Sequence, residues 1–196
     1  MTGLFIGPER YRRVFEQLRR NRSGMAATEF ALLLPVLVVM FLGVVEGSDA
    51  LSQSQRVGLA VNALADLAAQ EEELLVSDVD DLFGGVAQII GDDESNMKIR
   101  LVSVIADPDT GDLVVHWSRD NSGGEPYAVG SMYSALPPSM LFDPNSSVVV
   151  AEISYQYTSL LTHYIIDTIN FEDMATRWPR QSLRAQLCTS PGNCTS

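Results

Sequence analysis

The sequence predicts an α+β fold, in which a long N-terminal helix leads into a second helix and an antiparallel sheet of three to four strands. Three observations support this prediction. An unbroken apolar run lies near the N-terminus, apolar residues recur at helical spacing after it, and the pattern changes to a period of two from residue 97 onward.

Length and charge indicate a membrane-anchored domain. The chain has 196 residues, enough for one ordinary domain and an anchor. Residues 1–24 hold six Arg and two Glu, a net charge of +4. Because the whole chain has a net charge of −12, the remaining residues carry −16. This is the positive-inside pattern, so we expect the basic end to stay in the cytoplasm and the acidic body to cross. The acidic body argues against nucleic-acid binding, whereas the basic end could contact anionic lipid.

The apolar segment 25–45 has the length of a transmembrane helix. It covers 21 residues, which at about 1.5 Å per residue span a hydrocarbon core of about 30 Å. A secretory signal peptide is the first alternative, but the run is too long for its apolar region and no convincing cleavage site follows. A plain signal anchor explains everything except the combination of Gly24, Glu29 and Phe30.

Residues 46–70 should extend the same helix outside the membrane. Their apolar residues recur at spacings of three and four, and no proline occurs between Pro35 and Pro108. The helix should therefore continue to about Gln70, roughly 69 Å in all, with its second half packed on a soluble domain. Pro35 is expected to kink the membrane part or to free backbone carbonyls there.

A second helix is expected between residues 77 and 91. Ser77 can cap it, acidic residues fill its first turn, and Gly91 should end it. The preceding Glu71–Glu73 run is expected to be a solvated face or a helix end. The predicted buried stripe comprises Val79, Leu82, Phe83, Val86, Ile89 and Ile90.

The alternating pattern predicts an antiparallel sheet from residue 97 onward. Residues 97–105 and 113–118 should pair as a β-hairpin around the turn Asp107–Asp112. Residues 148–157 form the strongest strand pattern, and residues 171–178 could give a last strand that ends at Pro179. Residues 159–170 could be a short helix or an apolar loop.

The two cysteines predict a C-terminal disulfide. Cys188 and Cys194 flank a short loop with Pro-Gly at its centre, which suits a turn that brings the sulfurs together. In the periplasm they should be oxidised. No metal is expected, because such a site would need two more soft ligands and nothing places His116 or His163 near this loop.

No motif indicates an enzyme or a cofactor. The sequence lacks a Gly-x-Ser-x-Gly elbow and a phosphate-binding Gly-x-x-x-x-Gly-Lys loop. The turn Asp107–Asp112 could offer oxygen ligands to Ca²⁺, but it lacks the fuller calcium-loop pattern and a distal bidentate Glu, so a polar hairpin turn is the preferred interpretation. His116 is expected to face solvent or a sheet partner.

Glu29 is the strongest candidate functional residue. A lone carboxylate just inside an apolar segment costs a few kcal/mol in lipid, and intramembrane carboxylates are functional by default. The alternative is a Glu at headgroup depth that pairs with Arg22.

Three blocks carry a resemblance to a known family. The segment 22–35, which reads RSGMAATEFALLLP, resembles the start of a type IV prepilin, and its Gly-x-x-x-x-Glu-Phe form is similar to the Tad (Flp) branch. With segments 114–118 and 149–157 and the segment 177–182, which reads RWPRQS and is similar to an aromatic-Arg-Pro-Arg tail, the chain resembles a TadE/TadG-type minor pilin, or pseudopilin, of a Tad/Flp pilus system.

The resemblance implies a processed, single-pass inner-membrane protein with a pilin-like head. Residues 1–24 would be a cytoplasmic leader, cleaved between Gly24 and Met25 by a dedicated aspartic prepilin peptidase. Residues 25–45 would span the membrane, 46–70 would be a periplasmic helix extension, and 71–196 a periplasmic α+β domain. The new α-amine of Met25 would lie one helical turn from Glu29, so the two charges could neutralise each other within a subunit or between neighbours.

The implied role is initiation or tip assembly of a pilus. The major Flp pilin is far shorter and lacks a globular head, so the large body indicates the minor, tip-associated class. The implied partners are other pilins and minor pilins, which would pack on Phe30 and the apolar helix face, the prepilin peptidase, the inner-membrane assembly platform and membrane lipid. The alternative is an unprocessed, membrane-anchored periplasmic binding or scaffold domain, and an anchored periplasmic enzyme is a third possibility.

Overall fold

The computed structural model describes most of the chain and divides it into two compact units, residues 1–48 and 49–196. Most of the expected leader and most of the segment 159–170 lie outside the described residues. The described residues are 12, 15–17, 23–137, 140, 143, 145–158 and 168–194.

The long N-terminal helix is confirmed. Helix α2 covers Ser23–Ala68, 46 residues, and ends close to the expected Gln70. Pro35 lies inside this helix, which continues on both sides of it. The expected kink at Pro35 stays a prediction.

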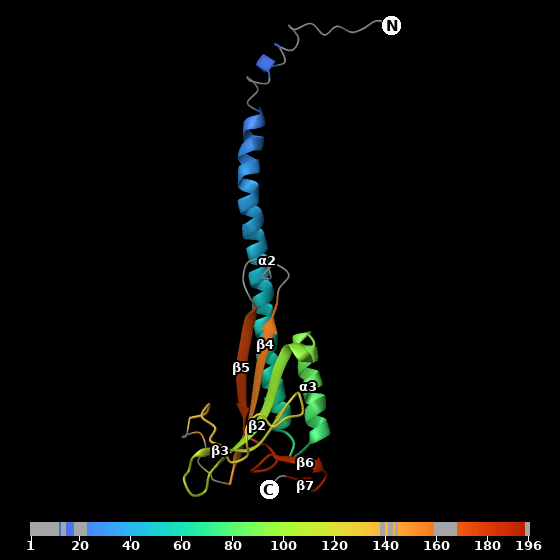
Figure 1. Cartoon of the computed structure of the whole chain (residues 1–196), viewed down its shortest axis with the longest axis vertical. Coiled ribbons are helices and arrows are strands. Elements are labelled where there is room, and N and C mark those ends of the chain that lie inside the picture. Colours follow the sequence, from blue (N-terminus) through green and yellow to red (C-terminus); the bar gives the residue numbers. More distant parts are fainter. Residues whose placement is uncertain are drawn as a thin grey trace, which may run out of the picture. The chain divides into compact units, whose positions relative to one another are not determined.

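The main sheet of the second unit has the predicted strands (Figure 1). Strand β2 (Met97–Ala106) pairs with β3 (Leu113–Asp120) and with β4 (Ser147–Tyr157), and β4 pairs with β5 (Ile169–Arg177). All three pairings are antiparallel, and the strand order is β3-β2-β4-β5. The hairpin, the strong central strand and the last strand are therefore confirmed.

Helix α3 (Val76–Ile90) confirms the second helix but corrects two details. Ser77 is not its cap, because the chain enters the helix from an extended Leu75, and Ser77 lies in the first turn. Ile89 is not in the buried stripe, since its side chain is 41% exposed. Gly91 does end the helix: its φ of 82° lies in the left-handed region, and its N–H donates to the carbonyl of Ala87 at 2.8 Å.

A second, smaller sheet was not predicted. Strand β1 (Glu73–Leu75) pairs in parallel with β6 (Gln186–Ser190), which pairs antiparallel with β7 (Asn193–Cys194). Glu71, Glu72 and Glu73 are all exposed, as expected of a solvated face, and Glu73 also begins β1. A short 3₁₀ turn, η1 (Glu94–Asn96), leads into β2.

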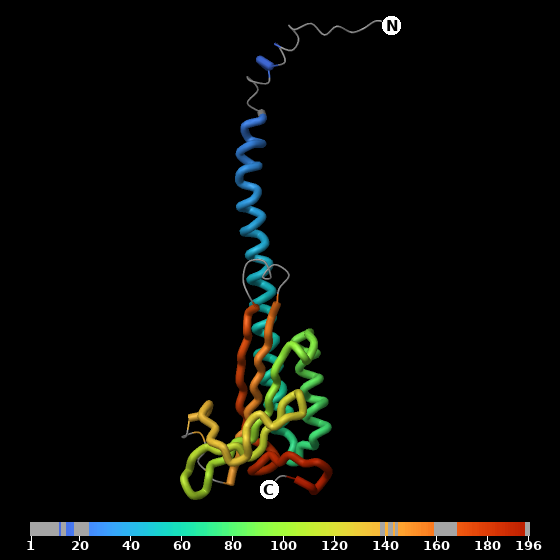
Figure 2. Tube along the Cα trace, in the orientation of Figure 1, coloured from blue at the N-terminus to red at the C-terminus, as the bar shows by residue number. Residues whose placement is uncertain are grey.

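The main sheet buries both faces, by different means. One face packs on α3 and on the part of α2 beyond residue 56, and this core includes Phe83 and Trp117. The opposite face is covered at one end by the segment after β3, through Tyr133 and Leu136; Figure 2 shows this segment in yellow beside the ends of β2 and β3. Further along this second face the side chains become polar, beginning at Glu152 of β4.

Candidate functional site

The first part of α2 is an apolar helix without a protein core around it. None of the residues in its most apolar window is buried, and the helix is long and apolar enough to cross a membrane. The side chains of Phe30, Leu32 and Phe41 are 58%, 77% and 67% exposed. An apolar surface of this extent is unfavourable in water and indicates that lipid or other helices cover it.

The proposed cleavage point lies at the start of this helix. Gly24 and Met25 both belong to α2, and a β-carbon added at Gly24 would meet no atom within 4 Å. The carbonyl of Met25 accepts a hydrogen bond from the hydroxyl of Thr28 at 2.8 Å. Side chains larger than glycine therefore fit the folded chain at position 24, and any need for glycine there would come from another molecule.

Glu29 and Phe30 are exposed on the same helix. Glu29 is four residues after Met25, one helical turn away. Among the described residues, its carboxylate has no ion pair or hydrogen bond. It is therefore a free charge on an apolar helix, which is the arrangement that calls for a partner in lipid. Arg22, the alternative partner, lies outside the described residues.

The C-terminal disulfide is present. The sulfurs of Cys188 and Cys194 are bonded, and the two residues lie opposite each other in the β6–β7 pairing. Cys188 is fully buried. A carboxylate oxygen of Glu73 lies within 4.8 Å of both sulfurs, and this side chain accepts the N–H of Gly192 at 3.1 Å. Since the sulfurs are bonded to each other, they are not thiolate ligands.

The Arg-Trp-Pro-Arg tail contacts the last turns of α2. The guanidinium of Arg177 donates to Asn62 at 2.8 Å, and that of Arg180 donates to the carboxylate of Asp66. The backbone N–H of Arg180 donates to the carbonyl of Ala69 at 2.9 Å. The tail thus fastens the chain after β5 to α2. These partners could not be read from the sequence, because they lie more than 100 residues apart.

A polar cluster that sequence reasoning missed is centred on Glu152 of β4. Its carboxylate accepts the hydroxyls of Tyr127, at 2.9 Å, and Tyr133, and it pairs with the guanidinium of Arg100 at 3.2 Å. That guanidinium also lies 5.8 Å from the ring centre of Tyr127. Burial, and then the hydrogen bond to Glu152, raise the pKa of Tyr133 far above its usual value. The cluster ties the segment after β3 to the sheet.

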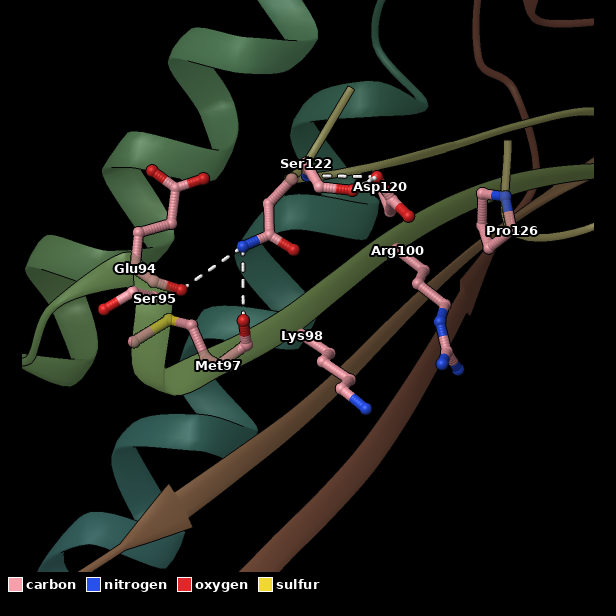
Figure 3. Close-up of a pocket in the computed structure, with 9 residues that line it drawn as sticks. Glu94, Ser95, Met97, Lys98, Arg100, Asp120, Ser122 and Pro126 are labelled. Carbon is pink, nitrogen blue, oxygen red and sulfur yellow. Dashed lines mark hydrogen bonds between the residues drawn. The ribbon is translucent and has the colours of Figure 1, made fainter. Parts of the chain in front are cut away.

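An open hollow of about 760 Å³ lies next to this cluster (Figure 3). Lys98 and Arg100 extend into it side by side from β2. Asn121, one of its lining residues, connects two parts of the lining: its side-chain amide donates to the backbone carbonyls of Glu94 and Met97 at 3.3 and 3.2 Å. No histidine or cysteine is among its lining residues. The hollow therefore offers charged and amide groups on an open surface.

Two sequence expectations about polar residues can be compared with the structure. Of the two alternatives for His116, it faces a sheet partner and not solvent: its side chain is buried, 6% exposed, with Nδ1 3.5 Å from the hydroxyl of Ser103 on the paired strand β2. The turn after β2 is a hairpin turn as predicted. The carboxylate of Asp107 accepts the backbone N–H groups of Asp109 and Thr110 at 2.8 and 3.0 Å, which hold its pKa below the usual value.

Comparison with known proteins gives one match. No curated protein and no solved structure matches the chain. Residues 24–66 match the family model described as TadE-like protein. The match begins at Gly24, includes Glu29, Phe30 and Pro35, and ends two residues before the end of α2. The resemblance drawn from the sequence is thus confirmed over this segment, in which the chain is similar to the TadE-like family.

Proposed function

We propose that the chain is a minor pilin or pseudopilin of a Tad/Flp pilus system. It is held in the bacterial inner membrane by the first part of α2, with its N-terminus in the cytoplasm and its head in the periplasm. A prepilin peptidase cleaves it after Gly24, and the processed subunit takes part in initiation or tip assembly of the pilus. Its role is in assembly and not in catalysis.

One observation carries this proposal. The family match begins at Gly24 and covers a helix whose first part carries apolar side chains without cover among the described residues. An exposed apolar helix that follows a basic end is suited to two environments in turn, first lipid and then the helices of neighbouring subunits. The proposal uses the same surface in both, so the helix needs no refolding on transfer between them.

Glu29 gives the helix packing its register. In lipid its free carboxylate is unfavourable by a few kcal/mol, which provides a driving force for any arrangement that neutralises it. Cleavage after Gly24 creates that partner, the α-amine of Met25. Pairing between the ammonium of one subunit and Glu29 of its neighbour would fix how far the two helices slide along each other.

The expected partners follow from this surface. Other pilins and minor pilins would pack on α2 around Phe30, and the peptidase and the assembly platform of the inner membrane would handle the same helix. The acidic head would remain outside the membrane, at the base or the tip of the fibre.

The decisive experiment is the intact mass of the protein extracted from membranes of cells with and without the prepilin peptidase. We expect peptidase-dependent loss of residues 1–24, with Met25 as the new N-terminus. The variant Gly24→Val should keep its leader even when the peptidase is present, and Gly43→Val is the matched control. A β-carbon has no neighbour within 4 Å at either position, so neither change strains the fold.

A full-length mass in both strains would overturn the pilin assignment. The chain would then be an unprocessed, membrane-anchored periplasmic binding or scaffold domain. Equal processing of Gly24→Val and Gly43→Val would place the cleavage at another residue.

A further inference from the structure

His116 occupies an irregular point of β3. In the β2–β3 pairing, Ser103 lies opposite Trp117 and the next residue, Val104, lies opposite Val115, so His116 has no partner residue on β2. An extra residue of this kind is a β-bulge, which re-aims side chains and is common next to functional sites. Here it buries the imidazole, which is 6% exposed.

The buried imidazole is suited to the neutral form only. Nδ1 lies 3.5 Å from the hydroxyl of Ser103, and Nε2 has no hydrogen-bond partner within the described part of the chain. Burial, and then repulsion by the guanidinium of Arg184, hold the pKa of His116 below its usual value. Of the described residues, Ser103 lies at hydrogen-bond distance from the ring, and Arg184 carries a positive charge that acts on it. A protonated ring would bury a second cation beside Arg184 and an N–H without an acceptor.

Arg184 belongs to a segment, Ser182–Ala185, that is hydrogen-bonded to Trp117 in the middle of β3 and to the start of β4. This segment leads directly into β6, which carries Cys188. The hydrogen bonds that hold it include four between described residues: Ser147 N–H to Leu183 O (2.8 Å), Ala185 N–H to Ser147 Oγ (3.0 Å), Trp117 Nε1 to Ala185 O (2.8 Å) and Arg184 Nε to Asn145 O (2.9 Å).

We propose that His116 is an acid-sensitive latch for the segment Ser182–Ala185. Neutral His116 tolerates Arg184 beside it, and the four hydrogen bonds keep the segment closed. Protonation repels Arg184 and loosens the segment from β3 and β4, while the Cys188–Cys194 bond keeps β6 and β7 joined. The direction follows from linkage, because the closed state binds the proton less tightly than the open state. The latch is therefore fully closed above the ordinary histidine pKa of about 6.5 and weakens as the pH falls below it.

The latch contains its own spectroscopic reporter. Trp117 donates to Ala185 across the contact, and the chain has one other tryptophan, Trp178, which is 45% exposed. In the background Trp178→Phe, the emission of the full chain in detergent micelles reports Trp117 alone. Between pH 7.5 and 5 we expect a reversible shift in that emission. Hydrogen exchange of the Ala185 amide, corrected for its intrinsic pH dependence, should rise by up to about tenfold per pH unit.

Three variants test the assignment. His116→Gln should abolish the transition, and His163→Gln, which removes the other histidine of the chain, should leave it unchanged. Arg184→Gln removes the repulsion and should move the midpoint up towards 6.5. If His116→Gln does not show the hydrogen-exchange pattern of the parent chain at pH 7.5, that variant is not folded like the parent. The test of the latch is then the midpoint of the Arg184→Gln transition. A transition that survives in His116→Gln, or a midpoint that Arg184→Gln leaves in place, would overturn the latch.

Discussion

At the scale of single residues, Glu29 differs from every other residue of the apolar helix. It is the only charged residue between Met25 and Val45, and its carboxylate is free of partners among the described residues. The change Glu29→Gln keeps the shape and removes the charge. We expect normal insertion and cleavage but about a tenfold loss of the subunit from sheared pili, because a charged hydrogen bond contributes about 1.5 to 3 kcal/mol.

Quantitative immunoblotting of sheared pili measures this loss, and Asp49→Asn is the matched control. Asp49 is an exposed carboxylate of the same helix, beyond the apolar segment, and its change should leave the pilus fraction as it is. Equal recovery of Glu29→Gln and the parent would contradict the role of the charge in assembly.

A second residue-scale prediction concerns Asp92 and Tyr155. The tyrosine hydroxyl donates to the carboxylate at 2.6 Å, and this bond is the main reason why the pKa of Asp92 lies below its ordinary value of 3.8. A carboxyl group with a lowered folded-state pKa adds stability that is complete above the unfolded pKa and is lost as the pH falls through the folded pKa.

Tyr155→Phe should therefore lower the free energy of unfolding by about 0.5 kcal/mol at pH 7, the low end for a hydrogen bond because Asp92 is partly exposed. The difference from the parent should shrink at pH 3. Urea unfolding at the two pH values measures it. Tyr157→Phe is the control, since among the described residues the Tyr157 hydroxyl has no hydrogen bond. A pH-independent difference would assign the effect to packing.

At the scale of elements, the sequence predicts those whose cause is local. Apolar residues recur with a period of 3.6 along α3 and of two along β2, β3 and β4, because the pattern follows from which of its own side chains each element buries. This pattern can be read from the sequence of the element alone. The cap at Ser77 fails because β1 precedes the helix directly, and β1 exists only through its parallel partner β6, more than 100 residues later. A three-residue strand has no periodicity to detect. The same limit applies to the site: Gly24, Glu29 and Phe30 are readable as a motif, whereas the Glu152 cluster and the His116 bulge depend on strand register.

The smaller sheet gives an element-scale prediction. The disulfide Cys188–Cys194 closes a loop with a sequence separation of six residues and joins β6 to β7. The double change Cys188→Ala and Cys194→Ala should lower the free energy of unfolding by about 2 kcal/mol, the chain-entropy value for so short a loop. Urea unfolding of the parent with and without reductant should show the same loss. The double variant should not respond to reductant, and a response would mean that the reductant acts elsewhere.

At the scale of the whole molecule, the two units differ in where their apolar side chains lie: the first unit exposes them, and the second buries many of them in a core. Every buried apolar residue of the described chain lies at or beyond Val57, while the apolar residues between Met25 and Val45 are exposed or, at most, half-buried. Within the described residues, the second unit thus contains the hydrophobic core, both sheets and the disulfide. The first unit has the composition of a membrane anchor and contributes no core of its own.

The unit 49–196 should therefore fold without the anchor. We expect this fragment, exported to the periplasm, to be a soluble monomer that unfolds in one cooperative transition, because domains with their own core fold alone. Sedimentation and circular dichroism test this, with the fragment 69–196 as the control. That control lacks the part of α2 that supplies Val57, Val61 and Leu64 to the core, and its loss should expose the helix-covered face of the main sheet and cause aggregation. If 69–196 were as stable as 49–196, the outer half of α2 would have no part in the stability of the head.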